Sequence, residues 1–348
     1  MAERVAIVLF NLGGPDQPSS IRPFLMNLFT DKAILRVPFF IRPILARIIA
    51  GKRVKPATEN YALIGGKSPL LELTQAQARA LEEALPELTA KCFIAMRYWH
   101  PMSLETARQV KAWSPDRVIL LPLYPHYSST TTGSSLEAWR IAASEVGLMA
   151  PVITLCCWPD EPAFVASTAA TLARELAQAR KIYPDQKVRV LFSAHGLPEI
   201  IVKQGDPYQT QIELCVAAVV EQLHEPELDW QICYQSRATP QKWLDPSTEH
   251  AIEQAGRENV GVVVVPIAFV SEHSETLVEL DREYGDLAMA KKLPFYVRVP
   301  AQNSDPGFIR ALEGMVRTLL KRDCGLASST GQRICALDKK DCPMRKLR

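Results

Sequence analysis

The 348-residue sequence has no apolar run long enough to cross a bilayer and almost no net charge. A membrane-spanning helix needs about 20 consecutive apolar residues, and charged residues interrupt every apolar stretch here sooner than that. The formal net charge of +2 lacks the basic excess that is typical of nucleic-acid-binding proteins, so no nucleic-acid partner is expected. The opening MAERVAIVLF passes from two charges directly into a strand-like run, so no signal peptide is expected either.

The eight cysteines do not indicate a disulfide framework. Most of them lie within apolar runs, where a free cysteine behaves as a small hydrophobic residue. Without an export signal the expected compartment is the reducing cytoplasm, where disulfides are rare. The hydrophobic fraction of 47% suits a globular protein with a sizeable core.

Short, β-branched apolar runs alternate along the chain with segments of helical periodicity. Continuous apolar strands that alternate with helices favour parallel sheets covered by helices on both faces. The pattern therefore predicts an α/β protein with two units, residues 1–150 and 151–320, followed by an irregular basic tail at 321–348. Ligands of such sheets bind at the carboxyl ends of the strands. The apolar runs lie at 5–12, 91–97, 117–123, 152–157, 188–192, 231–234 and 262–269.

Two strand exits in the first half carry glycine or hydroxyl groups. NLGGPD at 11–16 follows the first run, and it lacks the G-x-G-x-x-G fingerprint of dinucleotide-binding proteins. Taken alone, its double glycine is better explained by a tight turn. The loop YPHYSSTTTGSS at 124–135 precedes a predicted helix, so its donors could meet an anionic group. Ser134 could also simply cap that helix.

A histidine follows the apolar run at 188–192, in the motif SAHGLP at 193–198. At the exit of a buried parallel strand, and followed by glycine and proline, His195 is expected to face a cleft. Its ordinary pKa lies near neutrality, which suits it to accept a proton or to ligate a metal as neutral imidazole. A purely structural histidine is the alternative interpretation.

Four glutamates follow the last apolar run, within SEHSETLVELDREY at 271–284. If this segment is helical, Glu272, Glu275, Glu279 and Glu283 fall on one face. Such a stripe is either a solvated helix face or a group of carboxylates at a cleft that binds a divalent cation or passes protons. The apolar residues between them favour a helix with one buried side.

The segment at 32–55 contains seven basic residues and no acidic one, interleaved with apolar side chains. A basic amphipathic segment of this kind is typical of an element that lies on a membrane surface. A core-facing helix with a solvated basic face has the same composition.

At these residues the sequence closely resembles the ferrochelatase family, from about residue 5 to about residue 320. The resemblance depends on eight motifs that occur in the family's order. They are NLGGPD at 11–16, YALIGGKSPL at 61–70, MRYWHP at 96–101, LPLYPHYSSTTTGSS at 121–135, LFSAHGLPE at 191–199, GDPY at 205–208, YQSR at 234–237 and PIAFVSEHSETLVELD at 266–281.

The resemblance implies two Rossmann-like domains with a porphyrin cleft between them, and an enzyme that inserts Fe²⁺ into protoporphyrin IX in the last step of haem biosynthesis. It matches His195 to the family residue that faces the metal and takes up a pyrrole proton. Glu275 matches the residue opposite that histidine across the porphyrin, also facing the metal. His273 and Glu279 match further catalytic positions, and Glu279 is expected to begin an acidic path.

The resemblance also assigns binding and membrane residues. Porphyrin contacts are expected from Leu12, Tyr61, Ser68, Arg97, Tyr127, Trp243, Lys52 and Arg53. A lip that touches the bilayer is expected to expose Phe39, Phe40, Ile44 and Ile48. The implied location is the cytoplasm, peripherally attached to the inner membrane, with possible contact to the preceding enzyme of the haem pathway.

No cofactor beyond the substrate Fe²⁺ is implied. Animal relatives hold an iron–sulfur cluster through one loop cysteine and three tail cysteines, but Ser129 stands at the loop position here. The tail cysteines Cys324, Cys335 and Cys342 are widely spaced, so a [2Fe–2S] cluster is not expected.

Three alternative functions stay open: a coproporphyrin ferrochelatase, a non-catalytic porphyrin carrier, and a cobalt or nickel chelatase. Leu12 matches a position that is apolar in protoporphyrin enzymes and tyrosine in many coproporphyrin ones.

Overall fold

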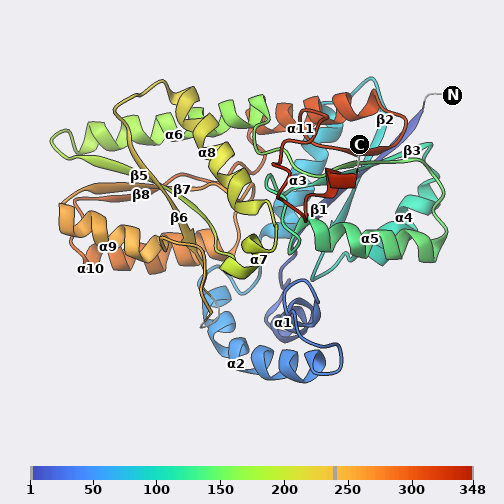
Figure 1. Cartoon of the computed structure of the whole chain (residues 1–348), viewed down its shortest axis with the longest axis horizontal. Helices are drawn as coiled ribbons and strands as arrows, with labels where there is room; N and C mark the ends of the chain where they lie inside the picture. The colour runs from blue at the N-terminus through green and yellow to red at the C-terminus, as the bar shows by residue number, and fades with distance from the viewer. Residues whose placement is uncertain (1–2, 238–240, 347–348) are drawn as a thin grey trace. The chain divides into compact units, whose positions relative to one another are not determined.

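The computed structural model describes residues 3–237 and 241–346, and the chain divides into two compact units. Unit 1 comprises Met1–Cys157 and Leu312–Arg333, and unit 2 comprises Trp158–Ala311 and Ile334–Arg348. Each unit is built around its own parallel β-sheet with helices on both faces (Figure 1). The predicted α/β class with parallel sheets is therefore confirmed.

The sheet of unit 1 has the strand order β2-β1-β3-β4-β9, and every described pair in it is parallel. The interior strand β1 is buried from Val5 to Asn11, which explains why the apolar run there is continuous rather than alternating. The strands are β1 (Arg4–Asn11), β2 (Thr89–Met96), β3 (Arg117–Pro122), β4 (Val152–Leu155) and β9 (Gly325–Ala327).

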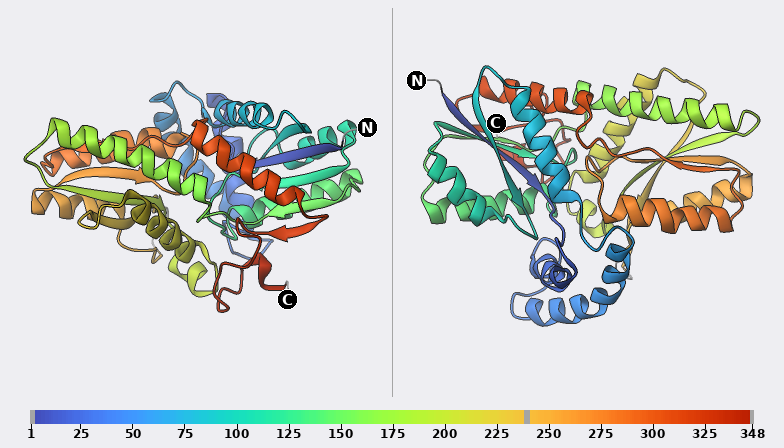
Figure 2. Two further views of the ribbon diagram at one scale, coloured as in Figure 1. Left: turned by 90° about the horizontal axis from the view of Figure 1, so that it is seen from above. Right: turned by 180° about the vertical axis from the view of Figure 1, so that it is seen from behind.

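Three helices of unit 1 cover its sheet, α4 and α5 on one face and α3 on the other (Figures 1 and 2). Alternate residues of β1 (Ala6, Val8 and Phe10) pack with α4 and α5, and the Phe10 ring meets the Trp139 ring edge-on with centroids 5.9 Å apart. These helices are α3 (Leu70–Glu83), α4 (Ser103–Trp113) and α5 (Thr132–Val146).

An α-helical pair extends from unit 1 before α3. It consists of α1 (Ile21–Thr30) and the long α2 (Arg42–Ala62), which pack against one another and are preceded by the short 3₁₀ helix η1 (Pro18–Ser20). The cluster that holds the pair together includes Phe24, Leu25, Ala50 and Tyr61. The predicted basic segment therefore contains the loop after α1 and the first half of α2.

The sheet of unit 2 has the order β6-β5-β7-β8, again with every described pair parallel. In Figure 1, α6 and α8 cover one face, and α9 and α10 cover the other. The elements are α6 (Pro162–Ile182), β5 (Val188–His195), α7 (Glu199–Lys203), α8 (Tyr208–Leu223), β6 (Asp229–Gln235), α9 (Thr248–Glu258), β7 (Gly261–Pro266), the π-helix η2 (Glu275–Glu283), α10 (Tyr284–Ala290) and β8 (Tyr296–Arg298).

Both sheets reverse their strand order beside their first strand. In unit 1 the chain passes from β1 outward to β2 and then back across to β3, and in unit 2 it passes from β5 to β6 and back to β7. Ligands of open α/β sheets bind outside the carboxyl ends of the strands at this reversal. In unit 2 this rule predicts a ligand-binding site at the carboxyl ends of β5 and β7.

The unit boundaries differ from the predicted ones. Strand β4 pairs with β3, so the first unit continues past residue 150. The tail expected to be irregular contributes β9 to the same sheet and later forms the 3₁₀ helix η3 (Pro343–Lys346). Helix α11 (Pro306–Leu320) spans the division between the units. The pairing partners of these short segments are remote in sequence, so local pattern did not indicate them.

Candidate functional site

His195 is the last residue of β5, at the strand reversal of unit 2. The strand preceding it is buried and paired on both sides, so its backbone is fixed up to the imidazole. The side chain itself is 40% exposed, as a group that must reach a substrate requires. Tyr208 donates its hydroxyl hydrogen to the His195 carbonyl oxygen at 3.0 Å, which anchors the exit of the strand.

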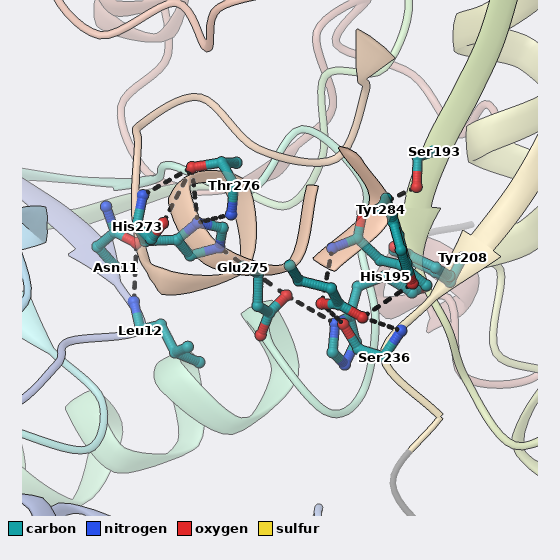
Figure 3. A network of polar contacts seen from close by, with 12 residues as sticks. Asn11, Leu12, Ser193, His195, Tyr208, Ser236, His273, Glu275, Thr276 and Tyr284 are labelled. Atoms are coloured by element: carbon teal, nitrogen blue, oxygen red, sulfur yellow. Dashed lines mark hydrogen bonds and ion pairs between the residues drawn. The ribbon is translucent and has the colours of Figure 1, made fainter. Parts of the chain in front are cut away.

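Glu275 begins η2, which follows β7, and its Oε2 lies 2.9 Å from His195 Nδ1 (Figure 3). The two residues are far apart in sequence but meet because β5 and β7 are neighbours in the sheet. Single π-helical turns are rare and occur frequently at functional sites. The resemblance led us to expect Glu275 opposite His195 across the porphyrin, whereas in this structure the two side chains are in direct contact.

The electrostatics of this pair favour its charged form. Burial lowers the pKa of His195, but the charge and hydrogen bond of Glu275 together with the charge of Glu279 outweigh it, so the pKa lies above its ordinary value. Burial also raises the pKa of Glu275, but the charge and hydrogen bond of His195 outweigh it, and the pKa of Glu275 is lowered. The raised pKa makes the imidazole a stronger base, and the lowered pKa keeps the Glu275 carboxylate ionised beside it.

His273 lies just before η2 and is almost fully buried. Its Nδ1 accepts a long hydrogen bond from the Thr276 backbone N–H at 3.4 Å, and its Nε2 lies 3.9 Å from Glu275 Oε2. Its ring packs on Phe269, with centroids 4.4 Å apart. Burial lowers the pKa of His273, so this imidazole is suited to be a neutral neighbour of Glu275.

Glu279 lies about one helical turn beyond Glu275 and is held by donors from β6 and from its own helix. Its carboxylate accepts hydrogen bonds from Gln235 Nε2 at 3.2 Å, from the Ser236 backbone N–H at 2.9 Å and from the Tyr284 hydroxyl at 3.0 Å. The Ser236 hydroxyl donates to it as well. Burial and the nearby Glu275 charge raise the pKa of Glu279 to about 7.

The predicted stripe of four glutamates is wrong at its ends. Glu272 precedes η2, where its Oε1 accepts from Arg298 at 2.8 Å and from the Ala301 backbone N–H at 2.9 Å. Glu283, at the other end, is exposed. The prediction assumed α-helical periodicity throughout, whereas the segment begins as a loop and continues as a π-helix with a different spacing.

Trp243 packs beside the exit of β5 within unit 2. A Cβ on Gly196 would lie 3.3 Å from the Trp243 ring and 2.7 Å from the Gln235 carbonyl oxygen. Glycine is therefore required at this close approach. The predicted pocket-wall residue Trp243 thus lies beside Gly196, the residue that follows His195, and Trp243 is 9% exposed.

Leu12 follows β1 in unit 1, and Ser68 contacts the loop that begins there. Leu12 is half-buried, and the Ser68 backbone N–H donates to the Pro15 carbonyl oxygen at 2.8 Å. A Cβ on Gly14 would come within 2.5 Å of Ser68, so this glycine allows the loop to close. Tyr61 is buried at the C-terminal end of α2 and its hydroxyl faces the same glycine.

Arg97 follows β2 and is bound by a buried acid that sequence reasoning missed. Its guanidinium donates to Asp31 at 2.8 Å and to Ser134 Oγ at 2.7 Å, and the Tyr98 hydroxyl also donates to Asp31 at 2.8 Å. Burial raises the pKa of Asp31, but Ser134, the Ala33 N–H and Arg97 together lower it below its ordinary value. The Arg97 side chain is therefore fixed in position, and Asp31 partly neutralises its positive charge.

The alternative role of Ser134 as a helix cap is wrong, because α5 begins after Thr131 and the Ser134 hydroxyl bonds to Asp31 instead. Tyr127 in the same loop is buried, and a Cβ on Gly133 would lie 2.8 Å from its hydroxyl.

The predicted lip residues are the most exposed large apolar side chains near α2. Phe39 and Phe40 are 78% and 64% exposed, and Ile44 and Ile48 are 64% and 51% exposed. Lys52 and Arg53 lie exposed further along α2. No helix among the described residues is long and apolar enough to span a bilayer.

One basic residue of the lip has a structural role. The Arg42 guanidinium donates to the carbonyl oxygens of Leu35 and Val37 at 3.1 and 2.8 Å, which closes the loop before α2.

The tail cysteines occupy different environments. Cys324 is exposed, whereas Cys335 and Cys342 are buried, and Gln211 Nε2 lies 3.1 Å from Cys335 Sγ. Ser129, at the loop position, accepts from Arg36 at 2.8 Å. Across residues 3–237 and 241–346, no three His, Cys, Asp or Glu side chains are grouped so as to hold a metal ion.

The residues that contact the site residues and were missed from the sequence include Asp31, Gln235, Ser236 and Tyr284. Gln235 and Ser236 belong to the quoted YQSR motif, which was the only local signal for either of them. Asp31 immediately precedes the basic segment at 32–55 and carried no signal, because its partners are distant in sequence.

The fold is that of a chelatase-type α/β protein. Among solved structures the chain is similar to the sirohydrochlorin chelatase SirB from Bacillus subtilis subspecies spizizenii, in complex with cobalt. The TM-score is 0.51 at 12% sequence identity, covering 91% of this chain and 96% of SirB. At this identity the likeness concerns the fold alone.

Sequence relatives identify the family. The ferrochelatase family model matches residues 4–320. A ferrochelatase of Caulobacter vibrioides is 49% identical, covering 99% of this chain and 99% of the relative. A ferrochelatase of Rickettsia bellii is 47% identical, covering 96% and 93%. The chain therefore belongs to the ferrochelatase family of metal-inserting enzymes, and the resemblance found in its motifs is confirmed.

Proposed function

We propose that this protein inserts Fe²⁺ into protoporphyrin IX, forming protohaem and releasing two protons. The observation that carries the proposal is the His195–Glu275 pair, 2.9 Å apart at the strand reversal of unit 2, in a chain of the ferrochelatase family. Metallation replaces two pyrrole N–H protons by one dication. The reaction therefore needs a base at the centre of the macrocycle and a weak oxygen or nitrogen ligand for the incoming iron.

His195 is the proposed base. Glu275 engages Nδ1, and a carboxylate at Nδ1–H fixes the tautomer in which Nε2 carries the lone pair. Nε2 then takes up a pyrrole proton, and the Glu275 carboxylate stabilises the imidazolium that forms. Glu275 is also the proposed ligand for iron on its way to the ring, because a hard carboxylate oxygen suits a divalent cation. His273 lies behind Glu275 and supports its orientation.

The proposed porphyrin-binding residues are the eight that the family resemblance assigns. Apolar contact comes from Leu12 and Trp243, and the exposed cations Lys52 and Arg53 are suited to the propionates. Tyr61, Ser68, Arg97 and Tyr127 complete the set. The apolar Leu12 supports protoporphyrin over the more polar coproporphyrin.

An insertion assay tests this function. The purified chain is mixed anaerobically with Fe²⁺ and either porphyrin, and the metalloporphyrin spectrum is followed. Faster insertion into protoporphyrin IX supports the proposal, and insertion into coproporphyrin alone contradicts it. His195→Ala should lower the rate by roughly 10²–10⁴-fold, as loss of a general base does, while porphyrin fluorescence quenching persists. His250→Ala, at an exposed histidine on α9, is the matched control.

We also propose that the lip attaches the protein to the cytoplasmic face of the inner membrane. Exposed aromatic and aliphatic side chains beside basic residues support this attachment, since each basic residue near an anionic surface contributes about 1 kcal/mol. Protoporphyrin partitions into lipid, so attachment would allow its direct transfer. Contact with the preceding pathway enzyme stays a prediction of the same kind.

Vesicle co-sedimentation tests the attachment. Binding should require anionic lipid and weaken with salt, because exposed charges are screened. Replacing Phe39, Phe40 and Ile44 by serine should release the protein while activity on detergent-solubilised porphyrin is kept. Replacing Ile141 and Met149, exposed apolar residues outside the lip, is the control. Unchanged vesicle binding after the lip substitutions would contradict the proposal.

We further propose that the protein needs no iron–sulfur cluster, which Ser129 at the loop position supports. An anaerobic preparation with two irons per chain and the spectrum of a [2Fe–2S] centre would contradict this.

A further inference from the structure

Two glutamates of η2, Glu275 and Glu279, accept very different numbers of hydrogen bonds. Among the described residues, Glu275 accepts one hydrogen bond, from His195. Glu279 accepts four, two on each carboxylate oxygen. An ionised carboxylate offers about four lone-pair positions, so those of Glu279 are all occupied and those of Glu275 are not.

Ser236 supplies two of the four donors from one residue. It follows β6 directly and has φ of 65°, in the left-handed region that residues with a side chain rarely adopt. In this conformation its backbone N–H meets Glu279 Oε1 at 2.9 Å while its hydroxyl meets Oε2 (Figure 3). Such backbone outliers occur at functional sites, where the surroundings enforce them.

The other two donors are held by their own partners. Gln235 is fully buried, and Ser193 donates to its Oε1 at 2.8 Å, which orients the Gln235 Nε2 group toward Glu279. Tyr284 packs in the core of unit 2 and directs its hydroxyl to Glu279 Oε1 at 3.0 Å. The Glu279 carboxyl is therefore fixed from both sides.

We propose that Ser236 is a positioning residue that holds Glu279 so that this carboxyl can take up a proton but cannot ligate iron. The inference rests on the proposed function and deepens it, since it divides the work of the two glutamates. The Gln235 and Ser236 N–H groups can only donate, so they always keep the carboxyl in place. The hydroxyls of Ser236 and Tyr284 can turn and accept, so a protonated Glu279 stays hydrogen-bonded.

Zn²⁺ binding to the full-length, porphyrin-free protein tests the division between the glutamates. The titration is made by calorimetry at about pH 6, where a carboxyl with a pKa of about 7 is largely protonated, so that Glu279→Gln removes little charge. Glu275→Gln should weaken Zn²⁺ binding roughly tenfold or more, whereas Glu279→Gln should leave the Kd unchanged. Equal weakening by both substitutions would make Glu279 a ligand and overturn the inference.

A double-mutant cycle tests the role of Ser236. Ser236→Ala should lower kcat by about tenfold with little change in KM, because a hydrogen bond to a charged group is lost. If Ser236 acts through Glu279, the same substitution should cost nothing further in the Glu279→Gln background. Additive losses would show that Ser236 acts elsewhere, and the positioning role would be rejected.

Tyr296→Phe is the matched control for both experiments. Its hydroxyl donates to the Leu280 carbonyl oxygen at 2.7 Å, so the substitution removes a buried bond to the same helix without touching Glu279. It should change neither the Kd for Zn²⁺ nor the kcat losses that the double-mutant cycle compares. If the wild-type protein inserted no iron, the proposed function would fail, while the Zn²⁺ titrations would still decide whether Glu279 is a ligand.

Discussion

Replacing Glu275 by glutamine removes the charge that faces His195 and keeps the shape of the side chain. Nδ1 of the histidine lies 2.9 Å from the carboxylate, so the two unit charges interact by about 1.4 kcal/mol even at the dielectric constant of bulk water. The His195 side chain is 40% exposed, which justifies this strongly screened value. A difference of about 1.4 kcal/mol is about one pKa unit, so the pKa of His195 should fall by at least about one unit.

The direction of the shift is fixed by the environment. Burial lowers the pKa of His195, whereas Glu275 and, to a smaller extent, the Glu279 charge raise it, so removing the Glu275 charge takes away the largest raising effect. In the wild type the raised pKa stabilises the fold below about pH 6.5, and this contribution is lost as the pH rises through the folded-state value. The lowered pKa of Glu275 likewise stabilises the fold above the ordinary pKa of a glutamate. This contribution of Glu275 is lost as the pH falls through its pKa in the folded state.

NMR titration of the imidazole signals measures the shift directly. The chain has six histidines, and the His195 signal is assigned as the one that is missing in His195→Ala. Glu275→Gln should also move the acidic limb of the kcat/KM profile to lower pH, since this limb reports the base of the free enzyme. An unchanged or raised pKa of His195 would refute the ion pair as the source of its electrostatics.

Three further substitutions test the structure around the site. Gly196→Ala places a Cβ 2.7 Å from a backbone carbonyl of β6 and should destabilise the fold by roughly 1–3 kcal/mol in urea unfolding; an unchanged midpoint would argue against the close approach. Asp31→Asn leaves Arg97 without its buried counter-charge and should cost roughly 3 kcal/mol of unfolding free energy, measured in the same way. Glu283→Gln should leave the iron-insertion rate unchanged because Glu283 is exposed, whereas a loss equal to that of Glu275→Gln would restore the four-glutamate stripe.

Seven of the nine strands in the described part of the chain could be predicted from local pattern. Most of the seven are nearly continuous apolar runs, because a parallel strand covered on both faces buries nearly every side chain, as β7 does along its whole length. The two strands that were missed, β8 and β9, have three residues each and lie at sheet edges. So short a segment carries no period of its own, and only its pairing partner makes it a strand.

The candidate residues could likewise be named from sequence, but their relations could not. His195 was identified from its place after a buried strand, and Glu275 from its place after another. Their contact depends on β5 and β7 being adjacent in the sheet, which is a property of the strand order. Family motifs supplied the expectation of a pair, and no local pattern supplied the distance.

The division of the glutamates was decided by tertiary structure alone. α-Helical periodicity would place Glu272 to Glu283 on one face. Instead, Glu272 bonds to Arg298, and Glu275–Glu283 form a π-helix. Hydrogen-bond donors from β6 then distinguish Glu279 from Glu275. The spacing of side chains along a chain is a local quantity. Burial, the number of hydrogen bonds and the pKa of a side chain depend on groups that other segments bring close. Those groups come together only once the sheet has assembled.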